Sequence, residues 1–255
     1  MRCIPLKKFT FAILTALAAG PLQAQQPPSE TGPQFGAGLG MIYSANAIAD
    51  ASDTLIVVPF FFYEAPNWYV RGPLAGYRAY QNQRVRIGLN ARVDFQSWKP
   101  DDSPALAGME RREMTVEFGA SASYRFNPVI LNLSVWQDAF DRHGGWESSV
   151  SLAYPHRLSD QLMLISRIEG TLLSGSKANY HYGIRPGESA PGRPVYRPGR
   201  SYTGGIGLSG NYRFNEDWLG QMDLALTFLS SDLRNSPIVD KRVLPRVILG
   251  VVRLF

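Results

Sequence analysis

Long stretches of alternating apolar and polar residues constrain the fold of this chain more than any other feature. Residues 84–95 (RVRIGLNARVDF) alternate at nearly every position, and residues 113–126, 201–214 and 218–228 follow a similar pattern. A period of two predicts β-strands, because successive side chains point to opposite faces. Strands of soluble proteins usually have about five or six residues, whereas a tilted membrane-crossing strand needs about 9 to 11. The length of the stretches therefore favours membrane-spanning strands.

Aromatic residues gather near the ends of the predicted strands, on the apolar face. They are Tyr43, Phe95, Tyr124, Phe126, Trp146, Tyr154, Tyr202, Tyr212, Phe214, Trp218 and Phe228. Such girdles are typical of membrane barrels at the two lipid–water interfaces, although aromatics also favour strands in general. After Phe35 no window of 18 apolar residues occurs, so no membrane-spanning helix is expected.

The first 24 residues have the composition of a secretory signal peptide. Three basic residues precede an apolar run at 9–19 (FTFAILTALAA), which is too short to span a bilayer as a helix. A small residue, Ala24, then ends a plausible cleavage site. We expect a signal peptide over 1–24, a flexible periplasmic lead-in over 25–33 and an outer-membrane β-barrel over 34–255.

Removal of the signal peptide changes what the composition implies. Of 26 basic residues three leave, and the remaining 23 against 21 acidic residues give a formal charge of +2. The mature chain is therefore only slightly basic, and no nucleic-acid partner is expected. The single cysteine, Cys3, also leaves, so no disulfide is expected.

The connections between the predicted strands alternate in length. Short turns are expected near 65–67, 127–128, 155–160 and 215–217, and longer segments at 97–112, 175–200 and 231–242. The predicted strands are 34–45, 53–64, 67–71, 74–80, 84–96, 113–126, 129–138, 146–154, 161–174, 201–214, 218–230 and 243–255. An antiparallel transmembrane β-barrel of about twelve strands follows, with short turns and both termini in the periplasm. Pro73 interrupts the shortest pair, so ten or fourteen strands remain open.

The chain ends in an apolar strand, RVILGVVRLF. Phe255 shares a face with Val247, Leu249 and Val251, and a terminal aromatic residue resembles the signal that outer-membrane proteins present to the barrel assembly machinery. Arg253 departs from this pattern, because that position is usually apolar. It would lie near the interface, where a charge costs only about 0 to 1 kcal/mol.

Candidate catalytic groups are few. His143 is close in sequence to Asp138, Asp141 and Ser148, which resembles a Ser-His-Asp arrangement of an outer-membrane hydrolase. The alternative, which we favour, is a polar turn. The three histidines, His143, His156 and His181, fall in three separate connections without metal-ligand spacing. Gly204-Gly205-Ile206-Gly207 lies inside a predicted strand and indicates close packing rather than phosphate binding. We expect no catalytic residue, no cofactor and no metal.

Charged residues occupy the polar face of the predicted strands and would point into the lumen. They are Arg84, Arg86, Arg92, Glu113, Glu117, Arg125, Arg213 and Asp223. Mixed charges can line a water-filled channel, or they can pair and plug it. A barrel of about twelve strands lies between the packed eight-stranded type and the open porins, so the sequence leaves conduction open.

Short motifs ordered along the chain resemble one family of outer-membrane proteins. They are Pro59–Glu64 (PFFFYE), Ser103–Met109 (SPALAGM), His143-Gly144-Gly145, Tyr182-Gly183-Ile184, Glu188-Ser189-Ala190, Tyr196 and Ser236-Pro237-Ile238-Val239. Their order from Phe35 to Phe255 resembles the MipA/OmpV family, which is related to the MltA-interacting protein. The longest connection departs from the family by being more basic.

The resemblance implies a non-enzymatic role in the outer membrane of a Gram-negative bacterium. The family's namesake is regarded as a scaffold that joins a lytic transglycosylase to a penicillin-binding protein, and other members are linked to osmotic response, adhesion and antibiotic sensitivity. The expected partners are thus outer-membrane lipid, the barrel assembly machinery and these two murein enzymes. A small passive channel, an adhesin and an outer-membrane hydrolase are the alternatives.

Overall fold

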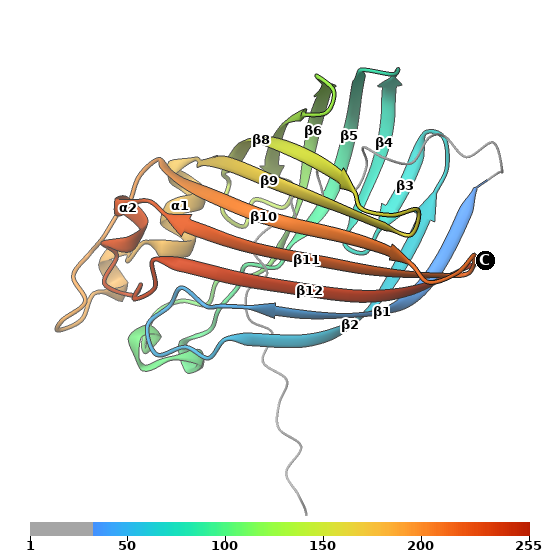
Figure 1. Cartoon of the computed structure of the whole chain (residues 1–255). Helices are drawn as coiled ribbons and strands as arrows, with labels where there is room; N and C mark the ends of the chain where they lie inside the picture. The colour runs from blue at the N-terminus through green and yellow to red at the C-terminus, as the bar shows by residue number, and fades with distance from the viewer. Residues whose placement is uncertain (1–32) are drawn as a thin grey trace, which may run out of the picture.

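The computed structural model describes residues 33–255, which form a closed antiparallel β-barrel of twelve strands (Figure 1). The strands are β1 (Gln34–Ser44), β2 (Thr54–Glu64), β3 (Trp68–Arg71), β4 (Leu74–Gln81), β5 (Val85–Asp94), β6 (Thr115–Arg125), β7 (Ile130–Asp138), β8 (Trp146–Arg157), β9 (Leu162–Leu173), β10 (Ser201–Arg213), β11 (Trp218–Leu229) and β12 (Val243–Leu254). The predicted fold class and strand count are confirmed. The predicted signal peptide and nearly all of the lead-in lie outside the described residues.

The barrel closes where its first and last strands meet. β1 pairs with β12 in antiparallel register from Gly36 opposite Leu254 onward, and the Phe255 N–H donates to the Phe35 carbonyl at 2.8 Å. A Cβ atom on Gly38 would lie 1.9 Å from the carbonyl oxygen of Val251. Only glycine therefore permits this close approach of the two backbones.

The segment interrupted by Pro73 forms two strands. β3 and β4 pair from Trp68 opposite Tyr77 to Arg71 opposite Leu74. The turn between them contains Gly72, whose φ of +56° lies in the left-handed region that suits glycine. This hairpin makes the strand count even, and so both ends of the barrel segment lie on the same side.

The outer surface of the barrel is apolar, because the alternation that predicted the strands places large hydrophobic side chains outward. Exposed examples are Leu39, Leu55, Val57, Ile87, Leu89, Phe118, Leu133, Val135, Val150, Leu152, Ile168, Ile206, Leu226, Leu249 and Val251. Exposed aromatics near strand ends include Tyr124, Phe126, Tyr154, Tyr202, Tyr212, Phe214, Trp218 and Phe228. No helix of the described residues is long and apolar enough to cross a membrane.

The two ends of the barrel differ. One, here called the terminal end, has the short turns 65–67, 82–84, 126–129, 158–161 and 214–217 together with both ends of the barrel segment. Pro155, which the sequence placed in a turn, lies within β8 instead. The opposite, capped end has the connections 45–53, 72–73, 95–114, 139–145, 174–200 and 230–242.

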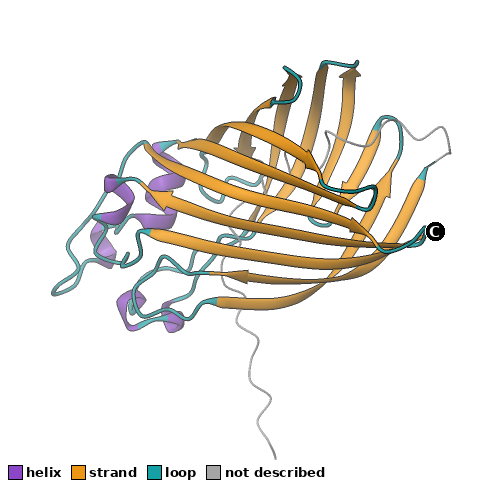
Figure 2. Cartoon of the chain, viewed as in Figure 1, coloured by secondary structure: helices purple, strands orange, loops and turns teal. Residues whose placement is uncertain are grey.

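The long connections at the capped end fold together into what we call the cap, comprising 45–53, 95–114, 139–145, 174–200 and 230–242. It contains α1 (Gly175–Tyr182), α2 (Ser231–Arg234) and the 3₁₀ turns η2 (Pro100–Asp102), η3 (Pro104–Leu106) and η4 (Pro186–Glu188). Figure 2 shows these helical segments gathered at the end opposite the C-terminus. Two apolar clusters hold the cap: Ala45, Ala47, Leu173, Ala178, Tyr182, Leu229, Leu233 and Leu244, and Ile48, Trp98, Leu106, Met109, Ile184 and Ile238.

Candidate functional site

Helix α1 directs a lysine into the lumen at the capped end. Ser174 caps the start of the helix, and its hydroxyl accepts from the backbone N–H of Lys177 at 3.3 Å. The Lys177 ammonium contacts carboxylates from three strands: Asp94 at 2.8 Å, Glu117 at 2.6 Å and Glu147 at 2.8 Å. One side chain of the cap thereby joins β5, β6 and β8.

Arg92 completes this buried ionic cluster, defined as Arg92, Asp94, Glu117, Glu147 and Lys177. Its guanidinium binds Glu117 at 2.5 Å, pairs with Glu147, and lies 4.1 Å from the centre of the Trp136 ring. Three carboxylates face two cations, so the cluster carries one net negative charge. Because ions buried without partners are costly, this pairing allows the five charged side chains to occupy the lumen together.

The charge state of Lys177 follows from its neighbours. Burial alone would lower the pKa of Lys177, because desolvation penalises the ammonium. The opposing attraction of Asp94, Glu147 and Glu117 outweighs burial and raises the pKa above its ordinary value. Lys177 is therefore a permanent cation at neutral pH.

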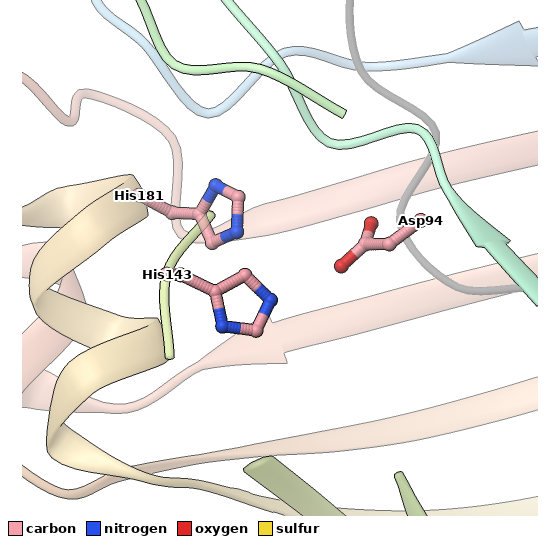
Figure 3. A group of neighbouring side chains, drawn as sticks. All are labelled: Asp94, His143 and His181. Atoms are coloured by element: carbon pink, nitrogen blue, oxygen red, sulfur yellow. The ribbon is translucent and has the colours of Figure 1, made fainter. Parts of the chain in front are cut away.

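Two histidines lie beside the cluster, and this corrects the expectation that the histidines have no spacing suited to a metal. The ring centres of His143 and His181 are 5.7 Å apart. Ligand atoms of His143, His181 and Asp94 all lie within 4.8 Å of one another, and all three residues are buried (Figure 3). His156, by contrast, lies within β8 rather than in a turn and contacts the Ser166 hydroxyl at 3.1 Å.

The surroundings of the two histidine rings differ. His143 Nδ1 accepts from the Gly145 N–H at 3.0 Å, and its Nε2 lies 3.5 Å from Glu117 Oε1. Neither ring nitrogen of His181 has a hydrogen-bond partner among residues 33–255. Burial lowers the pKa of His181 to about 3, so its ring is neutral.

The possible Ser-His-Asp arrangement does not form. Asp138 accepts from Thr115 Oγ1 at 2.6 Å and from the backbone N–H groups of His143 and Gly144 at 2.7 and 3.0 Å. Its carboxylate therefore orders the turn. Ser148 follows the inward-pointing Glu147 on β8, and so faces the outside of the barrel. The favoured polar-turn interpretation needs one correction, because His143 in this turn is buried.

Further ion pairs occupy the lumen below the cluster. Asp223 binds Arg167 at 2.7 Å and Arg246 at 3.1 Å. Glu64 binds Arg71 at 2.6 Å and also pairs with Arg78. Gly205 and Gly207 make room for two of the long side chains: added Cβ atoms would lie 2.8 Å from Glu169 and 2.4 Å from Arg167.

The charged residues predicted to line the lumen lie in different parts of the structure. Arg92, Glu117 and Asp223 lie in the ion pairs above, whereas Arg86 and Arg213 line cavities. Arg125 is exposed at the terminal end of β6, Arg84 lies in the turn 82–84, and Glu113 lies in the cap and pairs with Arg142 at 2.7 Å. Glu147, Arg167 and Arg246 also point into the lumen and were not predicted, although the alternation along β8, β9 and β12 indicates them. Lys177 had no such signal, because it lies outside the strands.

Small cavities remain between these groups. One of about 70 Å³ borders Arg92, Glu147 and Lys177, and another of about 70 Å³ borders Tyr69, Arg86 and Asn90. A larger cavity of about 230 Å³ lies toward the terminal end and is lined in part by Arg71, Arg157 and Arg213. Charged side chains line all three cavities.

Residues of the predicted motifs meet in the cap. The Ser236 hydroxyl donates to the Tyr182 carbonyl at 2.6 Å, and the Tyr182 hydroxyl accepts from Gln96 at 3.1 Å. Glu188 accepts two hydrogen bonds from the Arg112 guanidinium at 2.8 and 2.9 Å. These contacts join connections far apart in sequence.

The remaining motif residues have local roles. The Tyr196 hydroxyl donates to the Asp232 carbonyl at 2.7 Å, and the Gly183 N–H ends α1 by donating to the Asn179 carbonyl. The Ser189 hydroxyl donates to the Pro186 carbonyl at 3.1 Å, and Pro237 is exposed. Phe255 is 71% exposed and stacks on Phe35. In the more basic part of the longest connection, Arg193 donates to the Ala105 carbonyl at 2.6 Å.

Comparison with known proteins extends over the whole barrel. The profile of the family described as "MltA-interacting protein MipA" matches residues 35–255. The MltA-interacting protein of Escherichia coli (strain K12) is 25% identical over 98% of this chain and 99% of its own. Outer membrane protein OmpV of Vibrio cholerae is 23% identical over 92% of this chain and 94% of its own.

Two solved structures are also similar to this chain. The translocator domain of the autotransporter NalP from Neisseria meningitidis matches with a TM-score of 0.44 and 12% identity, over 89% of this chain and 90% of its own. A mutant of the monoaromatic hydrocarbon channel TodX matches with a TM-score of 0.43 and 8% identity, over 89% and 91%. Taking the closed barrel and the match over 35–255 together, the chain is an outer-membrane β-barrel that belongs to the family of the MltA-interacting protein MipA.

Proposed function

We propose that this protein is a non-enzymatic scaffold that holds murein enzymes at the periplasmic face of the outer membrane. In this proposal the terminal end, with its short turns, faces the periplasm, and the cap faces outward, as is general for bacterial barrels. Relatives named MltA-interacting protein support a murein-enzyme partner, namely a lytic transglycosylase. A penicillin-binding protein is the proposed second partner.

The observation that carries the proposal is the network of ion pairs inside the barrel. Lys177 of the cap is bound by carboxylates of three strands, and further ion pairs occupy the interior. A barrel filled in this way offers its surfaces, rather than an open pore, for function. The side chains most suited to partners are then those that remain exposed at the two ends.

The terminal end has charged side chains suited to a protein partner. Exposed basic residues there are Arg84, Arg125, Arg157 and Arg253, and exposed acidic residues are Asp160, Glu216 and Asp217. Charges at the rim of an interface mainly raise the association rate and its salt dependence. We therefore expect these residues to steer a periplasmic partner.

Pull-down from a native membrane extract tests the scaffold. The folded, purified barrel is expected to retain a lytic transglycosylase and a penicillin-binding protein. Reversing two exposed charges at the terminal end, Arg84→Glu with Arg157→Glu, should weaken retention. Reversing two exposed charges of the cap, Arg197→Glu with Arg234→Glu, is the matched control and should leave it unchanged. Retention of neither enzyme by folded protein would overturn the proposal.

A small passive channel is the second candidate, favoured by the cavity of about 230 Å³ at the terminal end and the two smaller ones beyond it. Planar-bilayer recording separates it from the scaffold. The scaffold with a closed lumen gives no conductance steps, whereas regular steps from correctly folded protein would favour the channel.

A further inference from the structure

We propose that Asp94, His143 and His181 form a binding site for a first-row divalent transition metal of the zinc type. Each residue comes from a different part of the fold: the end of β5, the connection 139–145 and helix α1. A bound ion would therefore fasten the cap to the barrel wall. The site is separate from the exposed surfaces of the proposed scaffold and does not depend on that function.

The geometry is close to that of a metal site. The three ligand atoms lie within 4.8 Å of one another, and one ring nitrogen of each histidine is on the side of the Asp94 carboxylate (Figure 3). Bonds of about 2.0–2.2 Å in a tetrahedral zinc site place ligand atoms about 3.3–3.6 Å apart. Binding thus requires side-chain movements of about 1 Å.

His181 supplies an independent observation. It is 2% exposed, and within the described part of the chain neither of its ring nitrogens has a hydrogen-bond partner. Buried polar groups nearly always have a partner, because an unmet donor or acceptor is costly. A metal ion on the nitrogen that faces Asp94 would provide one.

The charge of the surroundings favours a cation. Asp94, Glu117 and Glu147 face two cations, Arg92 and Lys177, so one negative charge remains uncompensated. The two oxygens of Asp94 have different partners. One contacts the Lys177 ammonium, and the other accepts a hydrogen bond from the Gln96 backbone N–H at 3.0 Å. Carboxylate oxygens have further lone pairs for a metal.

His143 has an outer partner suited to a metal ligand. Its Nδ1 accepts from the Gly145 N–H, so the ring N–H of this tautomer is on Nε2. Coordination through Nε2 requires that proton to move to Nδ1, where Asp138 Oδ2 lies 3.6 Å away. A carboxylate behind a ligating imidazole is the usual second partner in such sites. Nitrogen and carboxylate ligands suit zinc and its neighbours rather than calcium.

Metal titration of untagged, folded protein tests the site. After chelator treatment and dialysis, isothermal titration with Zn²⁺ is expected to show one ion per chain, and Co²⁺ should give the visible absorption of a low-symmetry nitrogen–oxygen site. His181→Ala and His143→Ala should each weaken Zn²⁺ binding by more than about 100-fold. The matched control is His156→Ala, because His156 lies on β8 away from the site, and its binding should equal that of the wild type.

Folding of each variant is checked by the change in gel mobility on boiling. A second readout is protease cleavage of the cap, which Zn²⁺ should slow in the wild type and in His156→Ala only. Absence of stoichiometric Zn²⁺ binding by the folded wild type would overturn the proposal. So would Zn²⁺ binding by the folded His143→Ala and His181→Ala variants that is as tight as that of the wild type. Asp94→Asn serves if a histidine variant does not fold, and the same loss of binding is expected.

Discussion

Replacement of Lys177 by methionine is the sharpest test of the buried ionic cluster. Methionine has nearly the same length but no charge. In the wild type the ammonium contacts three carboxylates at 2.6–2.8 Å, and its side chain is 3% exposed. The variant leaves Asp94, Glu117 and Glu147 with Arg92 as their only partner in the cluster. The net charge of the cluster then changes from −1 to −2.

The size of the effect follows from burial. Removal of one partner from a buried ion pair costs about 3–5 kcal/mol, because the remaining charge is left without compensation. Arg92 still binds Glu117 and Glu147, so Asp94 is the carboxylate that loses most. We expect the free energy of unfolding to fall by about 3–5 kcal/mol, which is roughly a 150-fold to 5,000-fold change in the unfolding equilibrium.

Urea titration of the barrel in lipid vesicles, followed by gel mobility without boiling, measures this change. The matched control is Lys241→Met, which removes an ammonium from a half-exposed pair with Asp53 at 2.5 Å in the same cap. A surface pair of this kind contributes about 0–1 kcal/mol. If both variants shift the urea midpoint equally, the ionic cluster does not hold the cap, and the reasoning fails.

Three other perturbations address the seam and the cap. Gly38→Val would place a Cβ atom 1.9 Å from the Val251 carbonyl and should prevent barrel closure, seen as loss of the heat-dependent gel shift, whereas Gly204→Ala, with no atom within 4 Å, should fold normally. Arg112→Met leaves Glu188 buried without its guanidinium and should destabilise the cap by about 3–5 kcal/mol, measured as faster protease cleavage there while the barrel stays intact. Burial alone would raise the pKa of Glu188, but two backbone N–H groups and Arg112 hold it below its usual 4.5. The resulting stability is complete above that pH and is lost as the pH falls through the lowered pKa. Acid-stable protease should therefore cleave the cap faster at lower pH, and Glu188→Gln should reduce this dependence.

The strands of this protein could be predicted from sequence because their pattern is local. Residues 84–95 alternate, and the structure places Leu89 outward and Arg92 inward as the period of two requires. Neighbouring antiparallel strands need only short turns, so their order along the chain is also their order around the barrel. Pro73 was the point that sequence left open. The hairpin of β3 and β4 decided it, since Gly72 can adopt a positive φ there.

The cap and its site could not be predicted from such a pattern. Helix α1 has eight residues and the 3₁₀ turns three each, too short for a periodic signal to be recognised within long connections. The predicted motif residues were found in the sequence, but their contacts were not. Glu188 and Arg112, for example, are 76 residues apart and meet only in the folded cap.

Sequence by itself determined which side chains of each strand face lipid and which face the interior, because that depends only on backbone alternation. Only tertiary structure decided which of the inward groups meet. Lys177 and Glu117 are 60 residues apart, and His143 and His181 lie in different connections. Closure of the barrel and the inward position of α1 bring them within a few ångströms. A pattern of period two defines a face, but the partner across the lumen depends on the three-dimensional path of the whole chain.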